Sequence, residues 1–199
     1  MSTSLTTLGL QLPTDPRWVN IAQMQLSEIL IDHAYCEQKA ASACISLIVH
    51  YPSRSKLVER LTPIVSEEWG HFQRVLKELK KRGIPLGHQR KDEYVRRLQD
   101  VLHKKGNGDD VFLDRLLVCA LIEARSCERF KLLSEQLADE GLQKFYHELM
   151  ISEAGHYRCF IELAEEYLPK EQVRQRWKEL LLAEAEIMRS LTVRGDRMH

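Results

Sequence analysis

The chain has 199 residues, of which 44% are hydrophobic and 29% charged, so it can bury one core and is not expected to be disordered. Its 29 basic and 29 acidic residues cancel, which excludes a nucleic-acid binder that is basic over its whole surface. The longest apolar run, Leu116 to Ile122, is too short to span a membrane. No secretory signal is visible at the N-terminus. We therefore expect a cytoplasmic protein without a membrane partner.

The five cysteines include no Cys-x-x-Cys pair, which argues against a zinc or iron–sulfur site. All of them fall within helical patterns, where a free cysteine behaves as a small core residue. These cysteines are Cys36, Cys44, Cys119, Cys127 and Cys159. The three tryptophans, Trp18, Trp69 and Trp177, are likewise interpreted as packing residues.

Helical periodicity fills most of the chain, and prolines and glycines divide it into segments. In chain order, the expected helices cover approximately 16–50, 53–82, 92–105, 110–138, 141–167 and 169–191. The start of the second helix has two alternatives. It begins near Ser53 and bends at Pro63, or it begins at Pro63 with Thr62 as its cap.

No segment shows the alternating β-branched pattern of a strand, so the sequence predicts an all-α fold. Two long helical hairpins, each suited to antiparallel packing, are joined by a crossover that carries one short helix. This is the outline of a ferritin-like four-helix bundle. We expect a single domain over 1–199, with hairpins at 16–83 and 110–167, a crossover at 84–109 and an extra C-terminal helix at 169–192.

Two Glu-x-x-His motifs stand out, Glu68 with His71 and Glu153 with His156. In a helix, residues three apart share one face, so each pair can bind one metal centre. Even two such motifs prove little by themselves, because one is expected by chance in a chain of this composition. However, the helical neighbours of both glutamates are mostly apolar, and an unpaired charge in an apolar stripe is costly. A bound metal cation makes such a position tolerable.

Each motif has a candidate partner on the preceding helix. Glu37 lies 31 residues before Glu68, and Glu123 lies 30 residues before Glu153. Folding each hairpin at its midpoint brings the paired glutamates level, and neither partner's helix face carries a lysine or arginine. Glu128 is a rival to Glu123, but its helical neighbours Arg125, Lys131 and Glu135 indicate a solvated face. We therefore favour Glu123.

The predicted metal ligands are Glu37, Glu68, His71, Glu123, Glu153 and His156. Four carboxylates and two imidazoles form the ligand set of a di-iron or di-manganese carboxylate centre and match a structural zinc site poorly. The alternative is a helical bundle whose acids form ion pairs. A glycine inside each motif, Gly70 and Gly155, suggests the close approach of a neighbouring helix. Four further residues are either candidates to orient the ligands from the surrounding layer or ordinary core and surface packing residues, namely Asp32, His33, Tyr35 and Tyr157.

The strings DHAYCEQKAA, SEEWGHF, LIEARSCERF and SEAGHYRCF occur in this order along the chain. In sequence and spacing they resemble the bacterial tRNA hydroxylases that act on 2-methylthio-N6-isopentenyladenosine beside the anticodon. The resemblance spans nearly the whole chain and falls on the same six ligands. It implies a non-haem di-iron monooxygenase with two Fe ions, in which Glu68 and Glu153 are the catalytic bridging carboxylates.

The resemblance further implies that dioxygen and two electrons are consumed as the isopentenyl side chain is hydroxylated. The sequence has no dinucleotide fingerprint, cysteine cluster or flavin domain, so an external electron donor is expected, either a reductase or a ferredoxin. Phe72, Phe130 and Phe160 would suit a prenyl group and limit the access of water. Two rival functions remain, a ferritin-like iron-handling or peroxide-reducing protein and a helical interaction module without metal.

A tRNA partner requires a cationic surface despite zero net charge. The stretch from Lys77 to Lys105 contains ten basic residues and only four acidic ones, and it also contains His88 and His103. The basic residues of this run lie at 77, 80, 81, 82, 90, 91, 96, 97, 104 and 105. The run is interpreted either as part of a tRNA surface or as an ordinary solvated helix surface.

Overall fold

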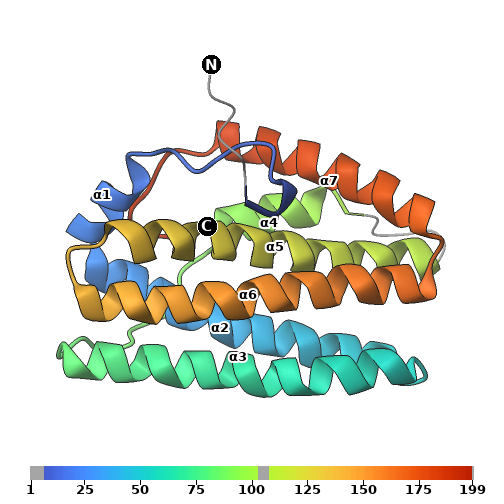
Figure 1. The fold of residues 1–199 in the computed structure, drawn as a ribbon, viewed down its shortest axis with the longest axis horizontal. Coiled ribbons are helices and arrows are strands. Elements are labelled where there is room, and N and C mark those ends of the chain that lie inside the picture. Colours follow the sequence, from blue (N-terminus) through green and yellow to red (C-terminus); the bar gives the residue numbers. More distant parts are fainter. Residues whose placement is uncertain (1–6, 103–107, 199) are drawn as a thin grey trace. The chain divides into compact units, whose positions relative to one another are not determined.

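The computed structural model describes residues 7–102 and 108–198, and within these residues it contains helices and no strand (Figure 1). The all-α prediction is thus confirmed. The elements are η1 (Thr7–Gly9), α1 (Trp18–Met24), α2 (Leu26–His50), α3 (Ser55–Lys81), α4 (Glu93–Asp100), α5 (Gly108–Gln136), α6 (Glu140–Tyr167) and α7 (Lys170–Ser190). None of these helices has a stretch long and apolar enough to cross a bilayer.

Most helix boundaries lie within two residues of the expected ones, but α4 ends at Asp100 instead of continuing toward Lys105, and residues 101 and 102 are not helical. Two further points concern α1–α2 and α3. The single helix predicted over 16–50 is broken at Gln25, where φ is −120° and ψ is 36°. The Gln25 N–H donates to the carbonyl of Ala22, three residues earlier, whereas in a regular α-helix the acceptor is four residues earlier. At Pro63 the helix is continuous, because α3 begins at Ser55 and passes through the proline. The alternative in which a helix starts at Pro63 is therefore wrong.

The chain divides into two compact units, and each is described by itself. The α2–α3 unit contains residues 17–91 and 194–198, and the α5–α6 unit contains the described residues of 1–16 and 92–193. Each unit is built on one of the two predicted helical hairpins. The single domain over 1–199 stays a prediction.

Each hairpin turns over a short connection with defined polar contacts. Between α2 and α3, the Arg54 N–H donates to the Tyr51 carbonyl at 3.0 Å. Between α5 and α6, the Asp139 carboxylate caps α6 by accepting from the Leu142 N–H at 3.0 Å. Because both connections are short, the helices that they join pack antiparallel along their lengths.

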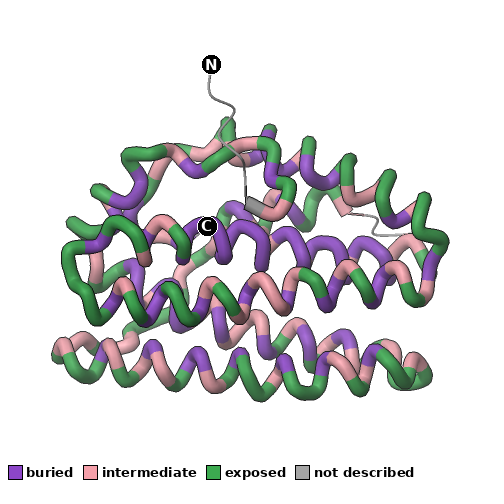
Figure 2. Tube along the Cα trace, viewed as in Figure 1, coloured by how far each residue is buried: buried purple, intermediate pink, exposed green. Residues whose placement is uncertain are grey.

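The core follows from the spacing of apolar residues. On α3 the buried residues recur every three or four positions, as at Leu57, Leu61 and Ile64, so one face of the helix is apolar and the other is solvated. Figure 2 shows the same alternation of buried and exposed segments along this helix. In contrast, α5 is buried on most sides, because η1, α6 and α7 all pack against it. The five cysteines form no disulfide, and Cys44, Cys127 and Cys159 are buried as expected.

A buried ion-pair network lies inside the α5–α6 unit. The guanidinium of Arg125 is fully buried and donates to Glu184 of α7 at 2.6 Å and to the carbonyl of Leu12 at 3.0 Å. It also donates to Glu128, one turn further along α5. Tyr94 of α4 donates its hydroxyl to Glu184 at 3.4 Å. The network therefore joins α4, α5 and α7 to one another and to the segment that precedes α1.

The charges of this network shift the acid–base properties of its members. Burial raises the pKa of Glu184 above its ordinary value, although Arg125 opposes this. Burial also lowers the pKa of Arg129 to about 10, and the neighbouring positive charge of Arg125 adds to the effect. A second pair, Arg176 of α7 with the buried Asp114 of α5 at 2.7 Å, fixes the other half of α7.

Removing Arg125 should therefore destabilise the α5–α6 unit strongly. Arg125→Met should lower the free energy of unfolding by about 3–5 kcal/mol, because Glu184 and Glu128 would be left buried without their cation. Arg189→Ala removes an exposed ion pair with Glu186 and should cost about 0–1 kcal/mol. Urea unfolding followed by circular dichroism measures both changes. A loss below 1 kcal/mol for Arg125→Met would contradict the structural role of the network.

Candidate metal centre

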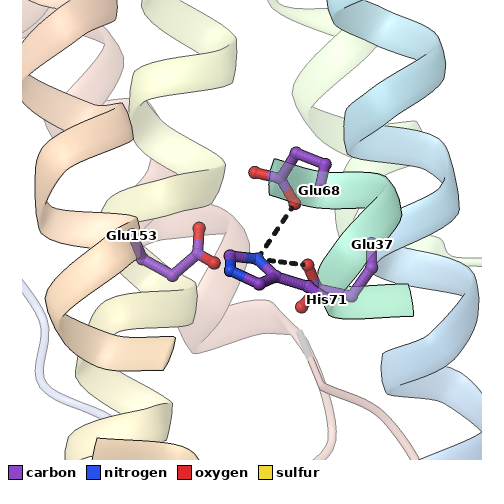
Figure 3. Close-up of side chains that lie close together, drawn as sticks. All are labelled: Glu37, Glu68, His71 and Glu153. Carbon is purple, nitrogen blue, oxygen red and sulfur yellow. Dashed lines mark ion pairs between the residues drawn. The ribbon is translucent and has the colours of Figure 1, made fainter. Parts of the chain in front are cut away.

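One carboxylate–histidine cluster lies in the α2–α3 unit. Glu37 comes from α2, whereas Glu68 and His71 come from α3, and all three are buried. The Nδ1 atom of His71 lies 3.4 Å from Glu37 Oε2 and 3.7 Å from Glu68 Oε2 (Figure 3). These separations exceed those of ordinary hydrogen bonds and suit ligand atoms around a common ion. The three sequence-predicted residues of this hairpin are therefore brought together.

His33 orients the carboxylate of this cluster. It lies one turn before Glu37 on α2, is fully buried, and places Nε2 2.6 Å from Glu37 Oε1. Burial alone would raise the pKa of Glu37, but the hydrogen bond and charge of His33, with help from His71, hold that pKa well below its ordinary value. His33 is thus placed where it can orient Glu37, and it favours the charged carboxylate that a metal ion requires.

A second cluster of the same composition lies in the α5–α6 unit. Glu123 comes from α5, Glu153 and His156 come from α6, and all three are buried. The Nδ1 atom of His156 lies 3.6 Å from Glu153 Oε2. Ser152 Oγ lies 3.5 Å from the other ring nitrogen of His156, so both sides of the imidazole have a polar neighbour. In each of the two clusters, one ligand atom per residue lies within 4.8 Å of the others.

The donor chemistry is the same in the two units. Each cluster has two carboxylates and one imidazole, and each histidine presents Nδ1 to the glutamate three residues before it. No thiolate joins the second cluster, because burial and the nearby Glu153 charge raise the pKa of the Cys127 thiol to about 12. Oxygen-rich ligation with one imidazole fits iron or manganese better than structural zinc.

The interpretation of Glu128 as part of a solvated face is wrong. Glu128 is buried, and it accepts hydrogen bonds from the Thr14 N–H at 3.1 Å and the Thr14 hydroxyl at 2.6 Å. It also pairs with Arg125. Glu128 therefore belongs to the buried ion-pair network, whereas Glu123 lies beside Glu153. A basic residue three positions before Glu128 was the available signal, but sequence alone does not tell a buried ion pair from an exposed one.

The glycine interpretation is also wrong. No described atom that is not local to the helix lies within 4 Å of a Cβ built on Gly70 or Gly155, so neither glycine is required by a close helix approach. Among the other candidates, Asp32 accepts from the Met198 N–H at 2.8 Å, and Tyr35 donates to the Gly87 carbonyl at 2.7 Å. These two residues anchor the C-terminal segment and the crossover.

Two further expectations concern the aromatic residues. The Tyr157 ring packs against Trp177 at 5.8 Å between centroids, and burial raises the pKa of Tyr157. Phe72, Phe130 and Phe160 are buried, as the predicted apolar walls require.

Half of the eight basic residues that the structure describes in this run are held in ion pairs. Lys104, Lys105 and His103 lie outside the described residues. Four of the remaining cations are held in ion pairs, namely Arg82 with Glu78, Arg90 with Glu28, and both Arg96 and Arg97 with Glu93. The lysines at 77, 80, 81 and 91 are exposed. Any phosphate contacts made by the described residues of this run are therefore expected mainly from lysines.

Comparison with known proteins gives concordant matches over the chain. The family model described as tRNA-(MS[2]IO[6]A)-hydroxylase (MiaE) matches residues 3–199. A protein of Pseudomonas putida named tRNA 2-(methylsulfanyl)-N(6)-isopentenyladenosine(37) hydroxylase is 36% identical over 178 residues, which cover 89% of this chain and 85% of that protein. The protein of the same name from Salmonella typhimurium is 27% identical, over 79% of this chain and 75% of that protein.

A solved structure is also similar. The structure titled "Protein 43 with aldehyde deformylating oxygenase activity from Synechococcus" superposes with a TM-score of 0.90 and 38% sequence identity. The match covers 96% of this chain and 94% of that chain. It confirms the ferritin-like fold class predicted from the sequence.

Substitution of the clustered residues should remove metal without unfolding the helices. Glu68→Ala and His156→Ala are each expected to lose most of the bound metal while keeping the helical content, because each ligand projects from a helix that is held by apolar packing. Metal analysis by inductively coupled plasma mass spectrometry, together with circular dichroism, measures this.

Glu128→Gln is the matched control on α5. It should retain the metal, whereas Glu123→Gln should lose it. If Glu128→Gln empties the site and Glu123→Gln leaves it full, the assignment of the α5 ligand is wrong.

Proposed function

Because the chain belongs to the tRNA-(MS[2]IO[6]A)-hydroxylase family, we propose that it hydroxylates the isopentenyl side chain of 2-methylthio-N6-isopentenyladenosine at position 37 of tRNA, next to the anticodon. The reaction is that of a monooxygenase, and the cofactor in this proposal is a pair of iron ions. The predicted cytoplasmic location belongs to the same proposal, since tRNA is processed there.

The observation that carries the proposal is the burial of two carboxylates beside one imidazole in each unit. Two buried carboxylates carry a charge that one divalent cation balances, so the two clusters have the charge for two Fe(II) ions. We assign Glu37, Glu68 and His71 to one ion and Glu123, Glu153 and His156 to the other. In this proposal Glu68 and Glu153 would be the catalytic carboxylates of the centre.

When bound, the two iron ions supply the activation of dioxygen. Hydroxylation converts one C–H bond, dioxygen, two electrons and two protons into an alcohol and water. The carboxylates compensate the charge of the ions, and His33 keeps Glu37 ionised and oriented through the contact at 2.6 Å. The buried rings of Phe72, Phe130 and Phe160 offer an apolar surface to the isopentenyl group and limit water near the reacting carbon.

The Synechococcus match raises one alternative substrate class. That structure is named for aldehyde deformylating oxygenase activity, so an aldehyde is a second candidate substrate for the same kind of centre. The family model and both curated relatives favour tRNA. An iron-handling or peroxide-reducing protein is the remaining alternative, and it predicts turnover without either organic substrate.

The decisive experiment compares tRNA nucleosides in cells with and without the active protein. Liquid chromatography with mass spectrometry should show the hydroxylated nucleoside only when the protein is present, and the unhydroxylated precursor should accumulate when Glu68→Ala replaces it. Purified protein should also be assayed with an aldehyde. Unchanged nucleosides in both strains, with turnover of the aldehyde, would reject the tRNA activity.

Sustained turnover should depend on an added reductase or ferredoxin. With oxygen, modified tRNA and catalase but no donor, the purified ferrous protein is expected to complete about one turnover at most, because the reaction consumes two electrons beyond those of the substrate. With a donor and ¹⁸O-labelled dioxygen, one labelled oxygen atom should enter the product. Many turnovers without a donor, or product oxygen derived from water, would exclude a monooxygenase.

A further inference from the structure

Trp69 is exposed, although the sequence predicts a packing residue at this position. Its side chain is 46% exposed, whereas Trp18 in the same unit is 1% exposed. The ring packs against that of Phe72 in a tilted arrangement, with 4.9 Å between the ring centroids. Trp69 also lies between the clustered residues Glu68 and His71 in sequence, but faces away from them on α3. The aromatic ring of Trp69 is therefore exposed to solvent, and Trp69 directly follows Glu68 of the candidate metal centre in sequence.

Three polar residues extend this surface along α3. Gln73, Lys77 and Lys80 lie four, eight and eleven positions after Trp69, and all are exposed. At 100° per residue these four side chains fall within an arc of about 80°, and they span about 16 Å along the helix. We call these four residues the α3 stripe. It presents an aromatic ring, then an amide, then two ammonium groups.

The polar members of the α3 stripe are available to a ligand. Lys77 and Lys80 make no ion pair with any residue of 7–102 or 108–198, although Arg82 nearby is held by Glu78. The amide of Gln73 likewise has no hydrogen-bond partner among those residues. Its donors and acceptor, and both lysine charges, therefore face solvent uncompensated.

We propose that the α3 stripe binds the anticodon loop of the tRNA, with Trp69 stacked on an unpaired base and Lys77 and Lys80 against the phosphates. The proposal rests on the proposed function, which supplies the tRNA. Sequence-specific recognition of RNA targets loops whose splayed bases stack on aromatic side chains. Charge complementarity selects this occupant, because a second copy of this chain or an apolar protein partner would use the ring but would not need the lysines.

The ring is tested by binding of a fluorescent anticodon stem–loop that carries the modified adenosine. Trp69→Ala should raise the Kd about tenfold or more, as expected for the loss of one stacked base. Trp69→Phe should recover most of the affinity, since it keeps a ring. Met24→Ala is the matched control, because Met24 is a large apolar side chain of the same unit that is 86% exposed. Its Kd should equal that of the wild type.

The lysines are tested by the salt dependence of the same binding. The double variant Lys77→Ala/Lys80→Ala should reduce the slope of log Kd against log salt by about 1.4, from two lost single-strand phosphate contacts. Lys56→Ala, at the other end of α3, is the control and should leave the slope unchanged. Iron content must match the wild type in every variant, so that a disturbed metal centre is not mistaken for lost RNA contact.

The outcomes separate this proposal from the proposed function. If the wild type binds and hydroxylates the modified tRNA while Trp69→Ala and the double lysine variant keep its Kd and salt slope, only the α3 stripe proposal is overturned. If the wild type neither binds nor hydroxylates the tRNA, the proposed function fails and the stripe proposal fails with it. A sedimentation change in Trp69→Ala without RNA would assign the stripe to a protein contact and overturn its assignment to RNA.

Discussion

The burial of charge in apolar helices is the constraint on which the rest of this structure depends. Glu68 and Glu153 are almost fully enclosed, and so are their partners Glu37 and Glu123. A buried carboxylate must be compensated locally or it becomes protonated. The α2–α3 unit compensates Glu37 with two imidazoles, which lower its pKa, and this keeps an ionised ligand inside an apolar hairpin. A metal cation bound at these carboxylates would complete the compensation of their charge. The buried charges that cost folding energy would then also be the ligands of the metal.

α5 shows two solutions to this constraint only five residues apart. Glu128 is neutralised by a permanent cation, Arg125, and by two hydrogen bonds from Thr14. Glu123 instead lies with Glu153 and His156, groups that can bind an exchangeable ion. An arginine beside Glu123 would neutralise it with a covalently attached cation and leave no place for an exchangeable ion. The buried ion-pair network also braces α5 through α7 and α4, which holds the backbone that carries Glu123. Glu128 and Glu123 thus lie on the same helix but on different faces of it.

The parts of this arrangement that local spacing determines were predictable from the sequence. Glu68, His71, Glu153 and His156 followed from two Glu-x-x-His motifs with apolar neighbours at helical spacing, which depend on residues within two turns. Glu37 and Glu123 followed from their separations of 31 and 30 residues along hairpins that fold at their midpoints. The burial of Glu128 was not predictable, since it depends on Thr14 and Glu184, which are distant in sequence. The exposure of Trp69 was missed for a related reason: the hydrophobicity of tryptophan indicates a preference for burial, but only the tertiary packing decides whether there is room. The break at Gln25 was also missed, because no proline or glycine near this residue indicates it.

A single helix can connect substrate docking to the reacting centre because its two faces are fixed relative to each other. On α3, Glu68, His71 and Phe72 are directed into the unit, whereas Trp69 and Gln73 are directed outward. A helix held along its length by Leu61, Ile64 and Val75 cannot rotate one face without displacing the other. A base stacked on Trp69 would therefore be held in a constant register with the carboxylate of the preceding residue. Such coupling would need no moving lid, since the distance between recognition and chemistry is set by the covalent geometry of one helical turn.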